Sequence, residues 1–153
     1  MVTVKEVPAD VLIKRLSEYL RENIRELRPP SWVNIVKLGV HKEEGPEDLN
    51  WWYVRAASIL RKLAVSSEPI GVSTLSIIYG GLKRRGSAPP HFRRAARNNL
   101  RKLLQQLERA GLVSRTPRGR VLTPKGQSLV SSIAFEVFTE LARERPDLSK
   151  YGS

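Results

Sequence analysis

The sequence of 153 residues contains no cysteine, a single methionine and few aromatic side chains (7%). Without cysteine the chain has no disulfide, no thiolate ligand for zinc and no thiol nucleophile. It also lacks any run that approaches the roughly 18 apolar residues of a membrane span, and its first residues lack the apolar segment of a signal peptide. These absences favour a soluble intracellular protein. The hydrophobic content of 41% argues against global disorder.

Negative charge is scarce, and the excess of positive charge is unevenly distributed. Lys and Arg number 27 and Asp and Glu number 15, so the formal net charge is +12. Residues 1–50 hold eight basic and nine acidic side chains, whereas residues 51–153 hold nineteen basic and six acidic ones. The charge that attracts a partner therefore lies in the second part of the chain, and a polyanion is the natural candidate.

The length suits one domain with a substantial core, and we expect residues 1–153 to form it. Apolar residues at helical spacing, helix caps and proline or glycine breaks predict a series of helices. These helices span about residues 8–27, 50–66, 72–79, 91–110 and 123–144. Two short strands, 112–115 and 120–122, flank a Pro-Arg-Gly turn and predict a β-hairpin. We expect an acidic loop at about 41–49, a basic loop at 82–90 and a frayed tail at about 146–153.

This order of elements is typical of a winged helix-turn-helix. We therefore predict a mostly α fold: a winged helix-turn-helix with a short β-hairpin wing and additional N- and C-terminal helices. Such a domain places its third helix and its wing against nucleic acid.

The predicted helix 50–66 separates its side chains into two faces. Trp52 falls with the apolar residues of the core, and Trp32, in the segment before this helix, is also expected in the core. Trp51 falls on the opposite, solvent-facing side with basic residues. Trp51 can act there as an RNA contact or pack as a half-buried aromatic, and the pattern leaves both readings open.

The basic residues gather where a winged helix meets nucleic acid. In the predicted helix 91–110, arginines four apart form a ridge, and segment 82–109 holds nine basic residues against one acid, Glu108. A merely solvated face would mix both signs, whereas the arginines of the wing are equally compatible with simple exposure. The candidate RNA-binding residues are Trp51, Arg55, Arg61, Lys62, Lys83, Arg84, Arg85, Arg93, Arg94, Arg97, Arg101, Lys102, Arg118 and Arg120, with Arg115 also on the wing.

No pattern predicts catalysis, a metal or a cofactor. His41 and His91 lie far apart, without other metal-type ligands near either of them. The acidic loop lacks the alternating ligands of a calcium site, and no glycine-rich phosphate loop occurs. We therefore expect a protein that is not an enzyme and that carries neither metal nor cofactor.

Four long stretches resemble one known family. They are WWYVRAASILRKL (51–63), IYGGLKRRGSAPPHFRRAARNNLRKLLQQLERAGLV (78–113), LTPKGQ (122–127) and PPSWVNIVKLGVHKE (29–43). They are similar to the small-subunit ribosomal protein S19e family of archaea and eukaryotes. The resemblance implies a winged-helix-like domain in the head of the small ribosomal subunit. Eukaryotic members are also needed for late maturation of the small-subunit rRNA precursor, near its 3′ end.

The resemblance also implies which positions are functionally sensitive. These positions are Trp51, Arg55, Arg61, Arg101-Lys102 and Gly119-Arg120. The chain departs from eukaryotic relatives at the wing tip, where Arg118-Gly119-Arg120 stands in place of Gly-Gly-Arg. It also lacks the Lys- and His-rich tail of some relatives, which favours an archaeal source.

We therefore predict an RNA-binding structural constituent of the small ribosomal subunit, located with the ribosome in the cytoplasm. Its expected partners are small-subunit rRNA and neighbouring ribosomal proteins, with no membrane partner and a monomeric state outside the ribosome. The alternative is a winged-helix DNA-binding regulator, which would be dimeric and sequence-specific. A nuclease would need clustered carboxylates or histidines beside the basic face, and Glu108 alone does not supply them.

Overall fold

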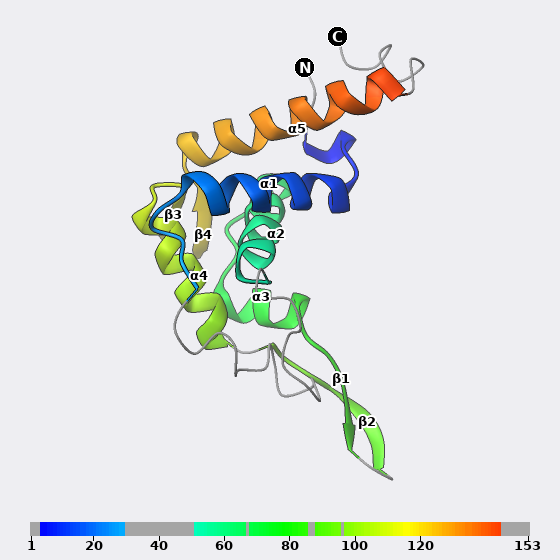
Figure 1. Cartoon of the computed structure of the whole chain (residues 1–153). Coiled ribbons are helices and arrows are strands. Elements are labelled where there is room, and N and C mark those ends of the chain that lie inside the picture. The colour runs from blue at the N-terminus through cyan, green and yellow to red at the C-terminus, as the bar shows by residue number, and fades with distance from the viewer. Residues whose placement is uncertain (1–3, 30–50, 67, 86–87, 96, 145–153) are drawn as a thin grey trace.

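The computed structural model describes residues 4–29, 51–66, 68–85, 88–95 and 97–144 (Figure 1). The predicted acidic loop at 41–49, Trp32, His41 and the tail at 146–153 lie outside this part of the chain. The elements in order are η1 (Val4–Glu6), α1 (Ala9–Asn23), α2 (Trp51–Val65), α3 (Val72–Ile78), β1 (Gly81–Arg85), β2 (Ala88–Arg93), α4 (Arg97–Arg109), β3 (Val113–Thr116), β4 (Gly119–Leu122) and α5 (Pro124–Glu144). This mostly helical, winged-helix-like architecture confirms the predicted fold class.

Helix α2 is central to the core, because α1, α4 and α5 all pack against it. Its Trp52, Ile59 and Leu60 are fully buried. In Figure 1, α1 and α5 run beside one another across one end of the molecule. The apolar stripe of each surrounding helix faces inward, as its spacing predicts: Leu12, Leu16 and Leu20 in α1, Leu100, Leu103, Leu104 and Leu107 in α4, and Val130, Ile133, Ala134 and Val137 in α5.

The long helix predicted for residues 91–110 is shorter than expected and begins at Arg97. Residues 88–93 form strand β2, which pairs antiparallel with β1 in a hairpin where a loop was predicted. The physical reason is Pro89-Pro90, because proline biases the residue before it towards extended backbone and cannot donate to a helix. The predicted ridge of Arg93, Arg97 and Arg101 on one helix is therefore wrong, because Arg93 lies in β2. Arg94 follows this strand and also precedes α4. His91 also lies in β2 and does not start the helix.

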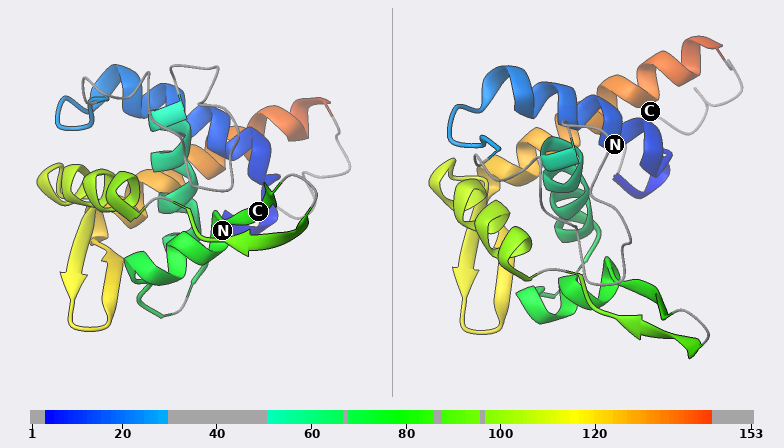
Figure 2. Two further views of the ribbon diagram at one scale, coloured as in Figure 1. Left: turned by 90° about the horizontal axis from the view of Figure 1, so that it is seen from below. Right: turned by 60° about the horizontal axis from the view of Figure 1, so that its bottom comes forward.

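Strands β3 and β4 form the wing, in the register Val113↔Leu122 to Thr116↔Gly119, close to the predicted hairpin. Figure 2 shows this wing beside α4, with the β1–β2 hairpin on another side of the helical body. The linker before α3 also pairs with the wing, since Arg120 N donates to Ile70 O (2.8 Å) and Ile70 N donates to Arg120 O (3.0 Å).

Gly119 makes this close approach possible. Its φ is +143°, and a Cβ there would lie 2.6 Å from the carbonyl carbon of Ile70. The linker can therefore approach the wing only because residue 119 has no side chain.

Helix α5 begins as its Thr-Pro signal predicts. Gly126 N donates a 3.1 Å hydrogen bond to Thr123 Oγ1, and Pro124 is the first helical residue. In the described ranges, no helix is both long and apolar enough to cross a membrane.

Candidate nucleic-acid interface

A cluster of cations lies around Tyr79, at the junction of α2 and α3. Tyr79 is the C-cap residue of α3, and its hydroxyl hydrogen-bonds the hydroxyl of Ser58 on α2 at 2.6 Å. The Arg55 Cζ lies 3.9 Å from the centroid of the Tyr79 ring, and the Lys62 Nζ lies 5.1 Å from it. Both cations are within the distance at which an aromatic ring attracts a positive charge. The structure thus brings two predicted site residues together on one ring. We call Arg55, Lys62 and Tyr79 the Tyr79 cluster.

The electrostatics of the Tyr79 cluster are dominated by burial. Burial lowers the pKa of the Arg55 guanidinium, and burial together with the charges of Arg61 and Arg55 lowers the pKa of Lys62. Burial also raises the pKa of the Tyr79 hydroxyl, against the opposing effect of the Ser58 hydrogen bond. In the part of the chain that the structure describes, no carboxylate forms an ion pair with either cation. The cluster is therefore a partly desolvated concentration of positive charge.

Trp51 does not face solvent, so that part of the sequence prediction is wrong. It is only 7% exposed, and its ring meets the Trp52 ring edge-on with the centroids 5.3 Å apart. A helical wheel assumes one solvent face, but Val54 is the only exposed residue of α2, and Ala57 beside the basic residues is also fully buried. Among the residues that the structure describes, the Trp51 Nε1 and the Arg61 Nε are buried and have no hydrogen-bond partner.

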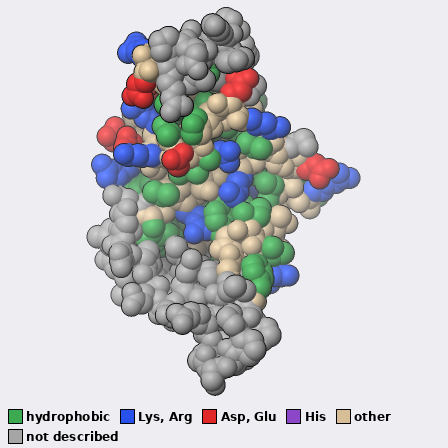
Figure 3. All heavy atoms as spheres, turned by 90° about the vertical axis from the view of Figure 1, so that its right-hand side faces the viewer, with side chains coloured by type: hydrophobic (Ala, Val, Ile, Leu, Met, Phe, Trp, Pro, Cys, Tyr) green, Lys and Arg blue, Asp and Glu red, His purple; other side chains and the backbone are tan. Residues whose placement is uncertain are grey.

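Exposed cations lie on α4 and on the wing. The exposed cations are Arg97, Arg101 and Lys102 of α4, Arg94 before this helix, and Arg115 and Arg118 on the wing. Figure 3 shows one face on which the acidic side chains lie in the upper half, while Lys and Arg continue below them. The side chains of Lys83, Arg84, Arg85 and Arg93 lie outside the described part of the structure.

Arg120 differs from the other wing arginines because it already has a protein partner. Its Nε lies 2.7 Å from Glu108 Oε1, and both side chains are largely shielded, at 13% and 27% exposure. This ion pair joins β4 to α4. The described contacts of Arg120 are therefore structural, through its side chain and through its backbone pairing with Ile70.

Sequence reasoning missed Tyr79. Its only signal was an aromatic residue at the end of a short helix, just before Gly80-Gly81. No spacing within α3 indicates that this ring crosses to α2. Its contact with Ser58 joins residues 21 positions apart.

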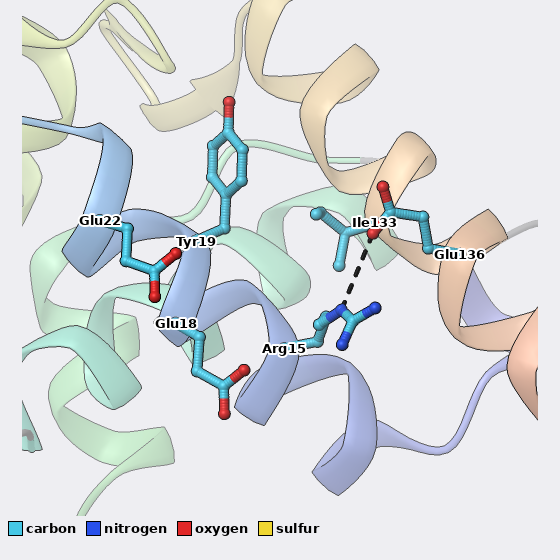
Figure 4. A pocket seen from close by; sticks show the side chains of 6 residues that line it. All are labelled: Arg15, Glu18, Tyr19, Glu22, Ile133 and Glu136. Carbon is cyan, nitrogen blue, oxygen red and sulfur yellow. Dashed lines mark ion pairs between the residues drawn. The ribbon is translucent and has the colours of Figure 1, made fainter.

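A groove between α1 and α5 has the opposite electrostatic character. It consists of two adjoining hollows of about 200 and 250 Å³ that share Arg15 and Glu18. Figure 4 shows the hollow lined by Glu18, Glu22 and Glu136. Arg15 pairs with Glu136 (3.8 Å) and with Glu140 (2.5 Å), which ties the two helices together. Carboxylates on both walls repel phosphate, so this groove does not belong to a nucleic-acid interface.

Within the described residues, no group of three or more His, Cys, Asp or Glu side chains is arranged to hold a metal ion. The chemistry that the site offers is therefore recognition by cations, hydrogen-bond donors and one aromatic ring.

Comparisons with known proteins agree with this picture. The family model of Ribosomal protein S19e matches residues 3–140. The chain is 53% identical to small ribosomal subunit protein eS19 of Aeropyrum pernix over 152 residues, which cover 99% of both chains. It is 40% identical to the eS19 protein of Thermoplasma acidophilum over 151 residues, again 99% of both chains. It is 41% identical to the eS19 protein of Myxine glutinosa over 136 residues, 88% of this chain and 92% of that protein.

The family match covers nearly the whole chain, and it confirms the resemblance inferred from the four sequence stretches. The archaeal relatives agree with the expected archaeal character. The chain therefore belongs to the ribosomal protein S19e family, and it is a ribosomal protein rather than an enzyme.

Proposed function

We propose that this chain is a structural constituent of the small ribosomal subunit that binds small-subunit rRNA in the subunit head. It does so in the cytoplasm, beside neighbouring ribosomal proteins, and it is a monomer before assembly. The observation that carries the proposal is the Tyr79 cluster, in which two cations are held together without a carboxylate partner in the described residues. The names of the relatives, which are small ribosomal subunit proteins, support it.

The proposed RNA surface combines the Tyr79 cluster with the exposed cations before and on α4 and on the wing. Arg and Lys there neutralise phosphates and release counterions, so the affinity should fall steeply with salt. Arg61 belongs to the proposal as a half-buried cation on α2, whereas the buried Trp51 supports this helix from within the core. Arg120 is left out because its Nε already donates to Glu108 and its side chain is only 13% exposed. Lys83, Arg84, Arg85 and Arg93 belong to it through the basic β1–β2 hairpin in which they lie.

Recognition of an irregular RNA surface is favoured over reading of a DNA groove. The cations lie on several elements, whereas a DNA regulator concentrates its base contacts on one recognition helix. In this chain α4 carries Arg97 and Arg101 but not the longer ridge that a recognition helix from residue 91 would have provided. By holding rRNA segments together, the protein would also support maturation of small-subunit rRNA and assembly of the subunit.

Sedimentation of a cell extract through a gradient at about 0.5 M salt tests this function, because salt at that level removes loosely held basic proteins. The protein is followed with a specific antibody. Migration with the small subunit is expected, and migration with free protein or chromatin would contradict the proposal.

A matched pair of variants sharpens the test. Arg101→Glu reverses an exposed charge on α4, whereas Lys5→Glu reverses an exposed charge on η1, away from the proposed surface. Only Arg101→Glu should reduce the fraction that migrates with the small subunit, with both variants melting near the wild-type temperature.

A further inference from the structure

We propose that Tyr79 is a positioning residue for RNA binding, whose ring holds Arg55 and Lys62 side by side so that both bind one segment of RNA phosphate backbone. The inference rests on the proposed function and adds to it a residue that supplies no charge. It concerns how the cations are presented, because long flexible side chains bind best when they are ordered in advance.

The geometry of α2 explains why a ring is needed for this task. Arg55 and Lys62 are seven residues apart, two turns along one face, so their Cα atoms are separated by about 10 Å. Arginine and lysine each have many rotamers, and two like charges repel. The Tyr79 ring lies within 3.9 Å of one cation and 5.1 Å of the other, and it attracts both.

Ser58 fixes the ring. It lies between the two cations on α2, three residues after Arg55 and four before Lys62. Its hydroxyl bonds the Tyr79 hydroxyl at 2.6 Å, and the ring is largely shielded from solvent. The ring orientation is therefore set by a hydrogen bond at its far end, and the cations adopt positions relative to a fixed surface.

Within the described residues, the way in which the cations are held leaves their hydrogen-bond donors unused. A structural arginine is normally held by a carboxylate, as Arg120 is by Glu108, and that contact occupies the Nε–H of Arg120. In the described part of the chain, Arg55 and Lys62 contact the ring face and form neither a hydrogen bond nor an ion pair. Their N–H groups remain available for phosphate oxygens, which accept several such bonds at once.

A double-mutant cycle tests the inference with a transcript of small-subunit rRNA as the probe. Affinity is measured over a range of salt concentrations for wild type, Tyr79→Leu, Arg55→Ala and the double variant, at a temperature where melting curves show all four folded. Tyr79→Leu should weaken binding roughly tenfold, the loss expected for about one charge-assisted contact. It should also make the slope of log K against log salt shallower by about 1. In the Arg55→Ala background the same change should cost clearly less, because Tyr79 acts through Arg55.

Two further variants separate positioning from simple packing. Tyr53→Leu removes a partly buried tyrosine of α2, and it should lower the melting temperature without changing the salt slope. Tyr79→Phe keeps the ring and loses the Ser58 bond, so its affinity should lie between those of wild type and Tyr79→Leu. Ser58→Ala removes the hydrogen-bond partner of the Tyr79 hydroxyl, so its affinity should equal that of Tyr79→Phe. If Tyr79→Leu does not fold, these two variants are compared with wild type instead.

An unchanged salt slope in Tyr79→Leu, or strictly additive effects in the cycle, would overturn the inference. Wild-type affinity and slope in both Tyr79→Phe and Ser58→Ala would overturn it as well, if Tyr79→Leu does not fold. If the wild-type protein itself fails to bind the transcript, the proposed function fails instead, so the two failures are distinguishable.

Discussion

The indole Nε1 of Trp52 donates a 2.9 Å hydrogen bond to the Oε1 of Gln106, which joins α2 to α4 at the edge of the core. The same amide group also holds the chain after α1, because Gln106 Nε2 donates to Arg28 O at 2.9 Å and its Oε1 accepts from Arg28 N at 3.2 Å. One side chain therefore connects segments of the chain that are 54 and 78 residues apart from it.

Replacing Gln106 should destabilise the fold because it removes the three hydrogen bonds that this side chain forms. Gln106→Leu keeps the size of the side chain but removes the partner of the buried Trp52 N–H, and it should lower the free energy of unfolding by about 1–3 kcal/mol. Urea unfolding followed by Trp fluorescence measures the change. Gln105→Leu, at the neighbouring half-buried position, should stay within about 0.5 kcal/mol of wild type. Equal losses at the two positions would contradict the role given to Gln106.

A methyl group at Gly119 should damage the contact between the wing and the linker before α3. Gly119→Ala would place a Cβ 2.6 Å from the Ile70 carbonyl carbon at a φ of +143°, and it should cost about 2 kcal/mol or more in unfolding free energy. At Gly71 a Cβ would meet no atom within 4 Å, so Gly71→Ala should cost less than about 1 kcal/mol. Thermal unfolding compares the two variants. A Gly119→Ala protein as stable as wild type would show that the linker and the wing can separate freely.

The wing arginines should divide into a binding residue and a structural residue. Arg118 is exposed, and Arg118→Ala should make the salt slope of rRNA binding shallower by about 1 while the melting temperature stays unchanged. Arg120→Ala removes the ion pair with Glu108 and should lower the melting temperature with little change in slope. Filter binding over a salt series and thermal melting together decide the matter. A shallower salt slope and an unchanged melting temperature in Arg120→Ala would instead show that Arg120 binds RNA.

The exposed cations of α4 should contribute to affinity without contributing to stability. Removing both charges in Arg101→Ala/Lys102→Ala should make the salt slope shallower by about 2 and leave the unfolding free energy within about 0.5 kcal/mol. Lys5→Ala/Lys14→Ala removes the same charge from η1 and α1, where both side chains are also exposed. If the two double variants weaken rRNA binding equally, general attraction rather than a defined surface would explain the affinity.

Most of the helical architecture could be predicted because local signals determine it. The period of Leu12, Leu16 and Leu20 predicts the buried face of α1, and the Thr123-Pro124 pair predicts the start of α5. The wing is similarly local, since Pro117 lies in its turn and Gly119 begins the strand that follows.

What could not be predicted depends on contacts between elements. The sequence predicts that α4 begins at residue 91, just after Pro89-Pro90, whereas strand pairing with β1 determines the backbone there. A wheel of α2 alone cannot show that Trp51 is buried or that Tyr79 crosses from α3 to lie on Arg55. The residue types of the site were therefore predictable, but its organising ring was not.

The pairing of α1 with α5 affects how the chain is made as well as how it folds. Arg15 of α1 and Glu140 of α5 are 125 positions apart. The outer flank of α1 is therefore covered only after α5 has been synthesised. Until then, α1 has only α2 and the middle of the chain to pack on. The face of α1 that α5 covers therefore stays exposed until α5 has been synthesised and has packed against it.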